Sequence, residues 1–222
     1  MRVFKWLSSL LYPEKCLLCG KLLDRMEMDL CHQCRVEAPE CPISRNKIPF
    51  LDSWTALWYY EGDVRSSLLR YKFYGRRNYA AGYGRLLAMK LQKEDRGDCD
   101  LLTFIPISDK RRRKRGYDQV ELLAQCVGRE LGVTPVPTMK KLRHNKPQSH
   151  ITGDAERRAN VLGVYGLLPG ADVKGKRIIL LDDIITTGAT AAEAAKVLLI
   201  AGAKEVHLAV IATAKHENKT KR

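Results

Sequence analysis

The chain has 222 residues, 45% of them hydrophobic, which is enough to bury the core of one full domain with a small appendage. It contains no apolar run of about 18 residues, so the sequence excludes a membrane-spanning helix. The formal net charge is +14, and this surplus favours anionic partners such as phosphorylated small molecules, nucleic acid or anionic lipid.

The start of the chain, MRVFKWLSSLLYPEKC, is basic and then apolar, but the apolar part is short and no small-residue cleavage site follows it. It therefore predicts an amphipathic helix rather than a signal peptide, with Phe4, Leu7 and Leu11 on one face. Docking of this helix onto the body is the simpler interpretation, and peripheral membrane contact is the alternative. We accordingly expect a cytoplasmic protein, either free or peripheral at the inner face of the cell membrane.

Four of the seven cysteines form two C-x-x-C pairs, Cys16 with Cys19 and Cys31 with Cys34. Without a secretory signal, such pairs bind metal more often than they form disulfides. Two knuckles suit a tetrahedral zinc ion, and four protein ligands make such a site structural. Buried or redox-active cysteines are the alternative, and Cys41 is a spare thiol or a competitor for the metal. We expect a zinc finger within residues 1–45 and a second domain over residues 46–222.

Strand and helix patterns alternate along the rest of the chain, as in α/β proteins with a parallel sheet flanked by helices. The predicted elements are strands at 54–60, 101–107, 161–168, 178–181 and 206–213, and helices at 63–74, 79–93, 118–131 and 189–201.

Two basic segments interrupt this alternation. The first, SDKRRRKRGYDQ, is predicted to be a loop and holds six consecutive cations, Lys110 to Arg115. A charge run is ordinarily a solvated face. Here it directly follows the carboxyl end of a strand, which favours contact with pyrophosphate or a polynucleotide backbone. Candidate ligand-binding residues of this segment are Ser108, Lys110 and Arg115.

The second basic segment, residues 140–160, is polar and nearly free of core residues. So long a loop in a compact domain is usually a lid or a binding loop. Its arginines can engage two oxygens of a pyrophosphate at once. The residues expected to close over the ligand are Arg143, Gln148, Arg157 and Arg158, of which Arg143 and Arg157 are candidate catalytic residues. The alternative is a surface loop with a short helix at 154–159.

The segment that organises the chain is KRIILLDDIITTGATAAEAAKVLLIA, residues 176–201. A buried strand is followed by Asp182 and Asp183, then by a hydroxyl-rich turn, then by a helix that ends before Gly202. Residues of the turn that can bind an anion are Thr186, Thr187, Gly188, Ala189 and Thr190, because helix N-termini present amides to anions. Asp182 and Asp183 are the other two candidate catalytic residues, since their carboxylates can accept hydrogen bonds from sugar hydroxyls or hold a water of a hydrated magnesium ion.

This segment closely resembles the phosphoribosyl pyrophosphate (PRPP) motif of type I phosphoribosyltransferases, four apolar residues followed by D-D-x-x-T-T-G-x-T, without gap or substitution. The resemblance implies that the acidic pair faces the ribose hydroxyls and that the T-T-G-x-T turn cradles the 5-phosphate.

The whole pattern resembles the ComF family, the ComFC-type and GntX-like proteins. The features that carry this resemblance are the four paired cysteines, the motif R-G-Y-D-Q at 115–119, the segment 148–161 and the acidic motif at 182–190. It implies a type I phosphoribosyltransferase fold behind a zinc finger, binding of PRPP, and a role in natural competence, the uptake of external DNA and its use in transformation, alongside other competence proteins.

Two hypotheses follow. In the first, the chain is a phosphoribosyltransferase with an unknown acceptor, and magnesium and the arginines stabilise the departing pyrophosphate. In the second, it is a binding module that senses PRPP and holds single-stranded DNA on its basic segments.

Overall fold

The computed structural model describes residues 14–42, 47–143 and 160–215. The helix expected before residue 14, the basic tail, the short helix at 154–159, and Gln148, Arg157 and Arg158 of the expected lid lie outside these residues. Within the described ranges, every helix is too short or too polar to traverse a lipid bilayer.

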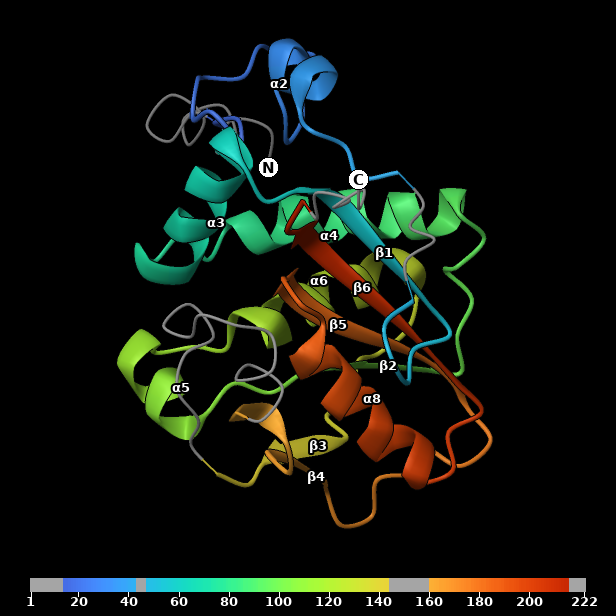
Figure 1. Ribbon diagram of the computed structural model, residues 1–222. Coiled ribbons are helices and arrows are strands. Elements are labelled where there is room, and N and C mark those ends of the chain that lie inside the picture. Colours follow the sequence, from blue (N-terminus) through green and yellow to red (C-terminus); the bar gives the residue numbers. More distant parts are fainter. Residues whose placement is uncertain (1–13, 43–46, 144–159, 216–222) are drawn as a thin grey trace, which may run out of the picture.

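A four-stranded parallel sheet forms the centre of the molecule (Figure 1). Its strands in spatial order are β1 (Ser53–Tyr59), β6 (Glu205–Thr213), β5 (Arg177–Ile185) and β2 (Leu101–Phe104). All three pairings are parallel, which confirms the expected fold class. Their carboxyl ends therefore meet at one edge of the sheet, where open α/β proteins bind ligands.

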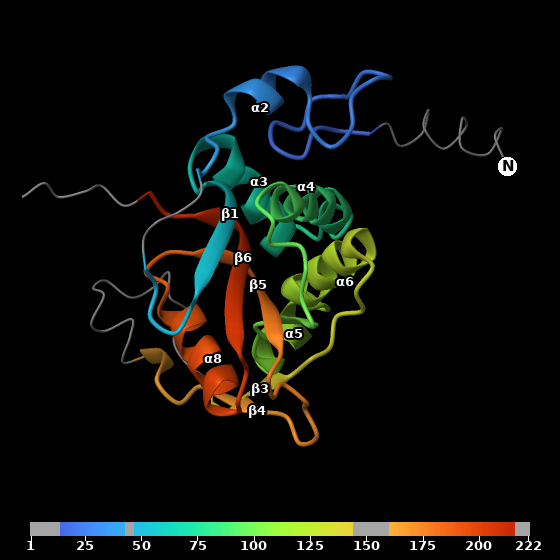
Figure 2. The same cartoon turned by 90° about the vertical axis from the view of Figure 1, so that its right-hand side faces the viewer.

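Helices cover both faces of the sheet (Figure 2). One face carries α3 (Gly62–Phe73), α4 (Tyr79–Lys93) and α6 (Gln119–Leu131). The other carries α8 (Ala189–Ile200) and a small antiparallel pair, β3 (Met139–Lys141) and β4 (Tyr165–Leu167). Each layer has its own hydrophobic core, so β5 and β6 are buried on both faces, as their unbroken apolar runs predict.

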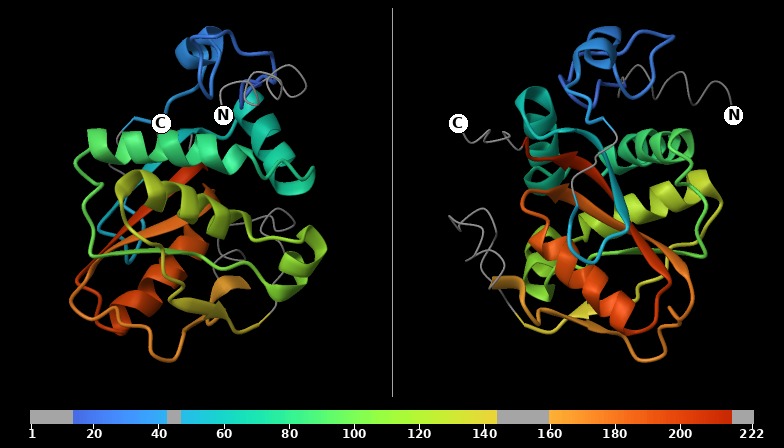
Figure 3. Two further views of the ribbon diagram at one scale, coloured as in Figure 1. Left: turned by 180° about the vertical axis from the view of Figure 1, so that it is seen from behind. Right: turned by 45° about the vertical axis from the view of Figure 1, so that its right-hand side comes forward.

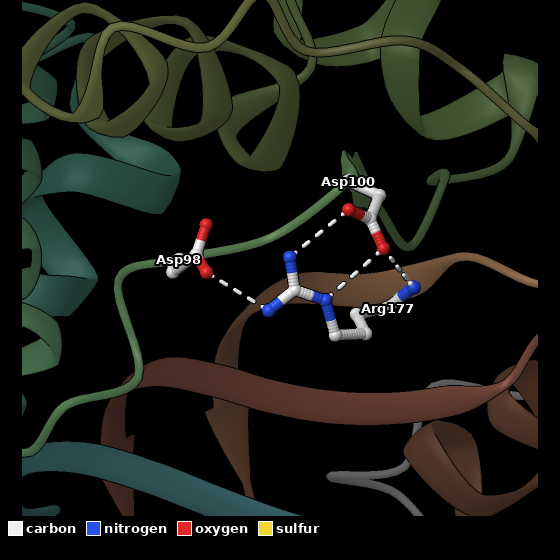
Figure 4. A network of polar contacts seen from close by, with 3 residues as sticks. All are labelled: Asp98, Asp100 and Arg177. Carbon is white, nitrogen blue, oxygen red and sulfur yellow. Dashed lines mark hydrogen bonds and ion pairs between the residues drawn. The ribbon is translucent and has the colours of Figure 1, made fainter.

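An ion-pair cluster fixes the start of β5 against the start of β2 (Figure 4). The guanidinium of Arg177 donates to both carboxylate oxygens of Asp100 at 3.0 and 3.1 Å and to Asp98 at 2.8 Å. The Arg177 backbone amide also donates to Asp100, at 2.9 Å. This clamp sets the register at the amino end of the strand, opposite the end that carries the acidic pair.

The predicted loop at 108–119 is wrong, because its cationic part is a helix, α5 (Asp109–Arg115). The hydroxyl of Ser108 accepts the Arg111 amide as an N-cap, and Gly116 ends the helix at φ 75°. Lysine and arginine are good helix formers, so the two caps are sufficient to define one short helix.

Several strand boundaries also differ from the prediction. The central strand β5 continues through the acidic pair to Ile185, because the apolar pair after it pairs with β6. The strand expected at 101–107 ends at Phe104, and the one expected at 161–168 is reduced to the three residues of β4. Residues 139–141, partly assigned to the lid, form β3, the partner of β4.

The four-cysteine segment, residues 14–42 with the short helix α2 (His32–Glu37), sits over α3 and α4 (Figure 3). Its buried Leu17, Leu18 and Leu30 belong to the same hydrophobic core as Tyr71 and Tyr83 of the two helices. The segment is therefore packed against the sheet layer rather than tethered to it.

Candidate functional site

The acidic pair lies near the carboxyl end of β5. Successive side chains of a strand point to opposite faces of the sheet. Asp183 is buried on the face covered by α3 and α6, and Asp182 is half-buried on the face of β3 and β4. The amide of Asp183 donates to the Asp182 carboxylate at 2.8 Å. The two carboxylates thus border the same strand end but have different neighbours.

Asp183 is held by two polar side chains from different helices. The ammonium of Lys72, in the last turn of α3, lies 2.9 Å from Asp183 Oδ1. The amide nitrogen of Gln119, at the start of α6, donates to Oδ2 at 3.1 Å. Tyr71 supports this arrangement by donating its hydroxyl to the Gln119 carbonyl at 2.5 Å. No described residue donates to Gln119 Oε1, although that oxygen is buried.

Asp182 faces a second cationic environment. Burial, together with the charge of Asp183, raises the pKa of the Asp182 carboxyl above its ordinary value. On the same side, burial and the nearby Arg111 lower the pKa of Lys141 to about 8, and its ammonium lies 5.5 Å from the centre of the Tyr165 ring. A carboxyl and an amine with pKa values displaced toward neutrality are common at ligand sites.

The hydroxyl-rich turn connects β5 directly to α8. Gly188 is the N-cap of α8 at φ 75°, a conformation that favours glycine. A Cβ at this position would lie 3.0 Å from the Ile48 side chain, so the close packing also requires glycine. Thr187 Oγ1 accepts the Ala189 amide at 3.4 Å. The turn therefore points the amino end of a twelve-residue helix at the edge that bears the carboxylates.

The R-G-Y-D-Q motif joins α5 to this site, and its polar side chains make separate contacts. Arg115 places its guanidinium 4.9 Å from the centre of the Phe73 ring. Tyr117 donates to the Tyr71 carbonyl at 2.5 Å. Asp118 is the N-cap of α6 and also accepts the Ile107 amide at 3.1 Å. These contacts place Gln119 against the acidic pair.

The other predicted cations lie around this edge with different partners. Lys110 is exposed on α5, whose N-cap is Ser108. The guanidinium of Arg143 donates to the Leu162 carbonyl at 2.5 Å, which ties the end of β3 to the chain before β4. No role beyond this contact is shown for Arg143, and its ligand-binding role stays a prediction.

Sequence reasoning missed three residues of this site: Lys72 and Gln119, which contact Asp183, and Lys141, which interacts electrostatically with Asp182. Gln119 belongs to the R-G-Y-D-Q motif, and Lys72 falls within the helix predicted at 63–74. The available signal was position: each stands at the boundary of an element, at the carboxyl edge of the sheet.

The four paired cysteines converge on one point, as predicted. The thiol sulfurs of Cys16, Cys19, Cys31 and Cys34 all lie within 4.8 Å of one another. Cys19 Sγ and Cys31 Sγ are 3.7 Å apart, close to the roughly 3.8 Å edge of a tetrahedron with 2.3 Å zinc–sulfur bonds. Three of the four are buried, and this donor set suits a structural zinc ion without an open coordination position.

Comparison with known proteins supports the phosphoribosyltransferase domain and identifies related proteins. The family model for the phosphoribosyl transferase domain matches residues 122–222. The chain is 29% identical over 203 residues to the DNA utilization protein YhgH of Salmonella typhi, covering 87% of each protein. It is 25% identical over 177 residues to Competence protein F of Haemophilus influenzae, covering 77% of each. It is also 25% identical over 209 residues to Competence protein ComFC of Bacillus subtilis, covering 87% of this chain and 82% of that one.

The fold, the acidic motif, the four-cysteine cluster and these relatives all agree with the resemblance found in the sequence. Together these findings support a ComF-type protein with a phosphoribosyltransferase domain.

Proposed function

We propose that this protein binds PRPP with magnesium at the carboxyl end of β5, binds single-stranded DNA on the adjoining basic surface, and acts in DNA uptake and transformation. The observation that carries the proposal is the continuity of the site. Asp182 and Asp183 lie near the carboxyl end of a central strand, and the chain passes from there through the turn 186–190 into the amino end of α8.

The residues of this edge match the parts of a phosphoribosyl ligand. The turn offers hydroxyls and helix-end amides to a 5-phosphate, since first-turn amides have no acceptor within their own helix. The carboxylates accept hydrogen bonds from ribose hydroxyls. Lys72 and Gln119 hold Asp183 in place before the ligand arrives, which lowers the cost of ordering the site.

Magnesium fits the same carboxylates, because hard oxygen donors are its usual protein ligands. When bound, it would neutralise charge on the ligand's pyrophosphate. Lys141, the cations of α5 and the predicted Arg143 and Arg157 would complete the anion-binding surface. A cation bound there would favour the charged form of Asp182, which opposes the effect of burial on its pKa.

Zinc at the four-cysteine cluster completes the proposal. The sulfur geometry supports it, and this ion would hold the knuckles that pack on α3 and α4.

Single-stranded DNA fits a surface made of α5 and the end of α3. Phe73 and Tyr74 are 62% and 74% exposed, which is unusual for aromatic side chains. Arg115 stacks on Phe73, and exposed cations of α5 lie next to it. Exposed aromatics stack on bases while cations contact phosphates, the combination used for single strands. The names of the relatives, which concern DNA utilization and competence, support this assignment.

Titration calorimetry tests the ligand site. PRPP with magnesium is expected to bind the zinc-loaded protein, and Asp183→Asn is expected to weaken binding at least about tenfold. The substitution removes the charge that accepts a hydrogen bond from a ribose hydroxyl and that pairs with Lys72. Asp172→Asn is the matched control, since Asp172 is an exposed carboxylate on the loop before β5 that pairs only locally with Lys176. Failure of PRPP to bind the unaltered protein would refute the proposed site.

Fluorescence anisotropy with a labelled single-stranded oligonucleotide tests the second part. Phe73→Ala and Tyr74→Ala are each expected to weaken DNA binding, with a loss of about 1–3 kcal/mol of binding free energy for each base that stacks on the ring. Met89→Ala, on the exposed side of α4, is the control. Affinity that is insensitive to salt and to the aromatic substitutions would contradict the DNA surface.

Catalysis is a separate question within the same site. Pyrophosphate release from PRPP across nucleobases, ammonia and glutamine would identify a transferase if one acceptor stimulates release and Asp183→Asn abolishes it.

A further inference from the structure

Helix α3 is attached at its middle to the first cysteine knuckle. The hydroxyl of Ser67 donates to the Leu17 carbonyl, and the guanidinium of Arg70 donates to the carbonyls of both Leu17 and Leu18. Leu17 and Leu18 are the two residues between Cys16 and Cys19, so these carbonyls belong to the turn that presents the two thiols. Both leucines are buried.

The next residues of the same helix reach the acidic pair. Tyr71 holds Gln119, and both Lys72 and Gln119 contact Asp183. Arg70 and Lys72 are two residues apart on one regular helix (Figure 1). The contacts to the knuckle and the contact to Asp183 therefore belong to one helix, with no loop between them.

A second attachment of the cysteine segment does not use α3. Arg85 of α4 donates to both carboxylate oxygens of Asp29. Gly82, one turn earlier, leaves room for Leu17 and Asp29, because a Cβ there would lie 2.5–2.6 Å from their side chains. This attachment fixes the segment on α4, at a place that contacts neither Lys72 nor Gln119 in the described contacts.

We propose that Ser67 and Arg70 couple the cysteine cluster to the phosphoribosyl site, so that metal in the cluster and ligand at Asp183 stabilise one another. The coupling rests on the proposed ligand site. Metal fixes the knuckle carbonyls, these fix α3, and α3 places Lys72 on Asp183. Coupling between two sites is reciprocal, so bound ligand must retain the metal as much as the metal favours the ligand. Ser67 and Arg70 touch neither ligand and act as positioning residues.

The experiment measures zinc release from the full-length protein into a colorimetric chelator, with and without saturating PRPP and magnesium. In the unaltered protein PRPP is expected to slow release about fivefold or more, the lower range of ordinary allosteric coupling. The quantity compared is the ratio of the zinc-release rate without PRPP to the rate with PRPP. Arg70→Gln and, independently, Ser67→Ala are expected to bring this ratio close to one. PRPP affinity of the zinc-loaded variants is measured by calorimetry, and circular dichroism verifies that they are folded.

Arg85→Gln is the matched control, because it removes a comparable contact with the same segment through α4. It is expected to speed zinc release both with and without PRPP, and to leave the ratio of these two rates as in the unaltered protein. If PRPP does not bind the unaltered protein, the proposed function fails and the coupling with it. If PRPP binds but leaves zinc release unchanged, or if Arg85→Gln abolishes the ratio as fully as Arg70→Gln, the coupling through α3 is wrong while the ligand site stands.

Discussion

Replacement of Lys72 by methionine tests whether the site is built around a buried ion pair. The gross attraction at 2.9 Å is about 6 kcal/mol at an effective dielectric constant of about 20, and desolvation of the two ions offsets much of it. Removing one partner of a buried pair costs about 3–5 kcal/mol. The side chains of Lys72 and Asp183 are 18% and 8% exposed, and partial exposure weakens such a pair, so we expect a loss just below that range, about 2–3 kcal/mol of unfolding free energy.

Urea denaturation of the zinc-loaded protein, followed by tryptophan fluorescence and circular dichroism, measures this loss. The double variant Lys72→Met with Asp183→Asn removes both charges, and we expect it to be more stable than the sum of the single variants by about 1–3 kcal/mol. Gln119 can still donate to the asparagine carbonyl in this variant. Single substitutions that cost less than about 0.5 kcal/mol and combine additively would refute the buried pair.

Three further predictions concern other parts of the molecule. Gly188→Ala and Gly175→Ala both place alanine at a positive φ, but only residue 188 packs on Ile48, so the first should lose about 1–2 kcal/mol more stability by urea denaturation and also lose PRPP affinity. Burial lowers the pKa of His207 to about 4, so the folded state keeps the imidazole neutral. Up to about 3 kcal/mol of unfolding free energy should therefore be lost as the pH falls from about 6.5 to 4. His207→Gln should remove this dependence of the denaturation midpoint on pH. Chelation of zinc should expose residues 14–42 to protease before the sheet, seen as early cleavages by mass spectrometry, and equal cleavage of sheet and segment would contradict a structural metal.

The sequence predicted the acidic motif well because its parts are contiguous. The strand, the two carboxylates, the threonine turn and α8 follow one another within residues 177–200, so local pattern and resemblance were sufficient. The cysteine cluster was predictable for a related reason, since the spacing within each knuckle fixes which thiols can share an ion.

The partners of the acidic pair were not predictable in this way. Lys72 and Gln119 meet Asp183 only because α3 and α6 cover the same face of the sheet, and no local pattern encodes that packing. The opposed directions of the two carboxylates follow from the strand period, but only once β5 is known to continue to Ile185. The helix α5 was not predicted, because a run of like charges usually indicates a solvated loop, whereas Ser108 and Gly116 cap this run as a helix.

The order of the sheet has a consequence for biosynthesis. Within the four-stranded sheet β1 is an outer strand that pairs with β6, and Ser53 lies opposite His207, 154 residues later in the chain. Until Glu205–Thr213 has left the ribosome, β1 and β5 each lack their shared neighbour, and the strand that bears the carboxylates is an open edge. The cysteine segment emerges long before that, so the four thiols of the proposed zinc site are available early. Nascent chains therefore pass through a stage in which β5 can pair with β2 but β1 and β5 still lack the strand between them, the stage at which a chaperone would be most needed.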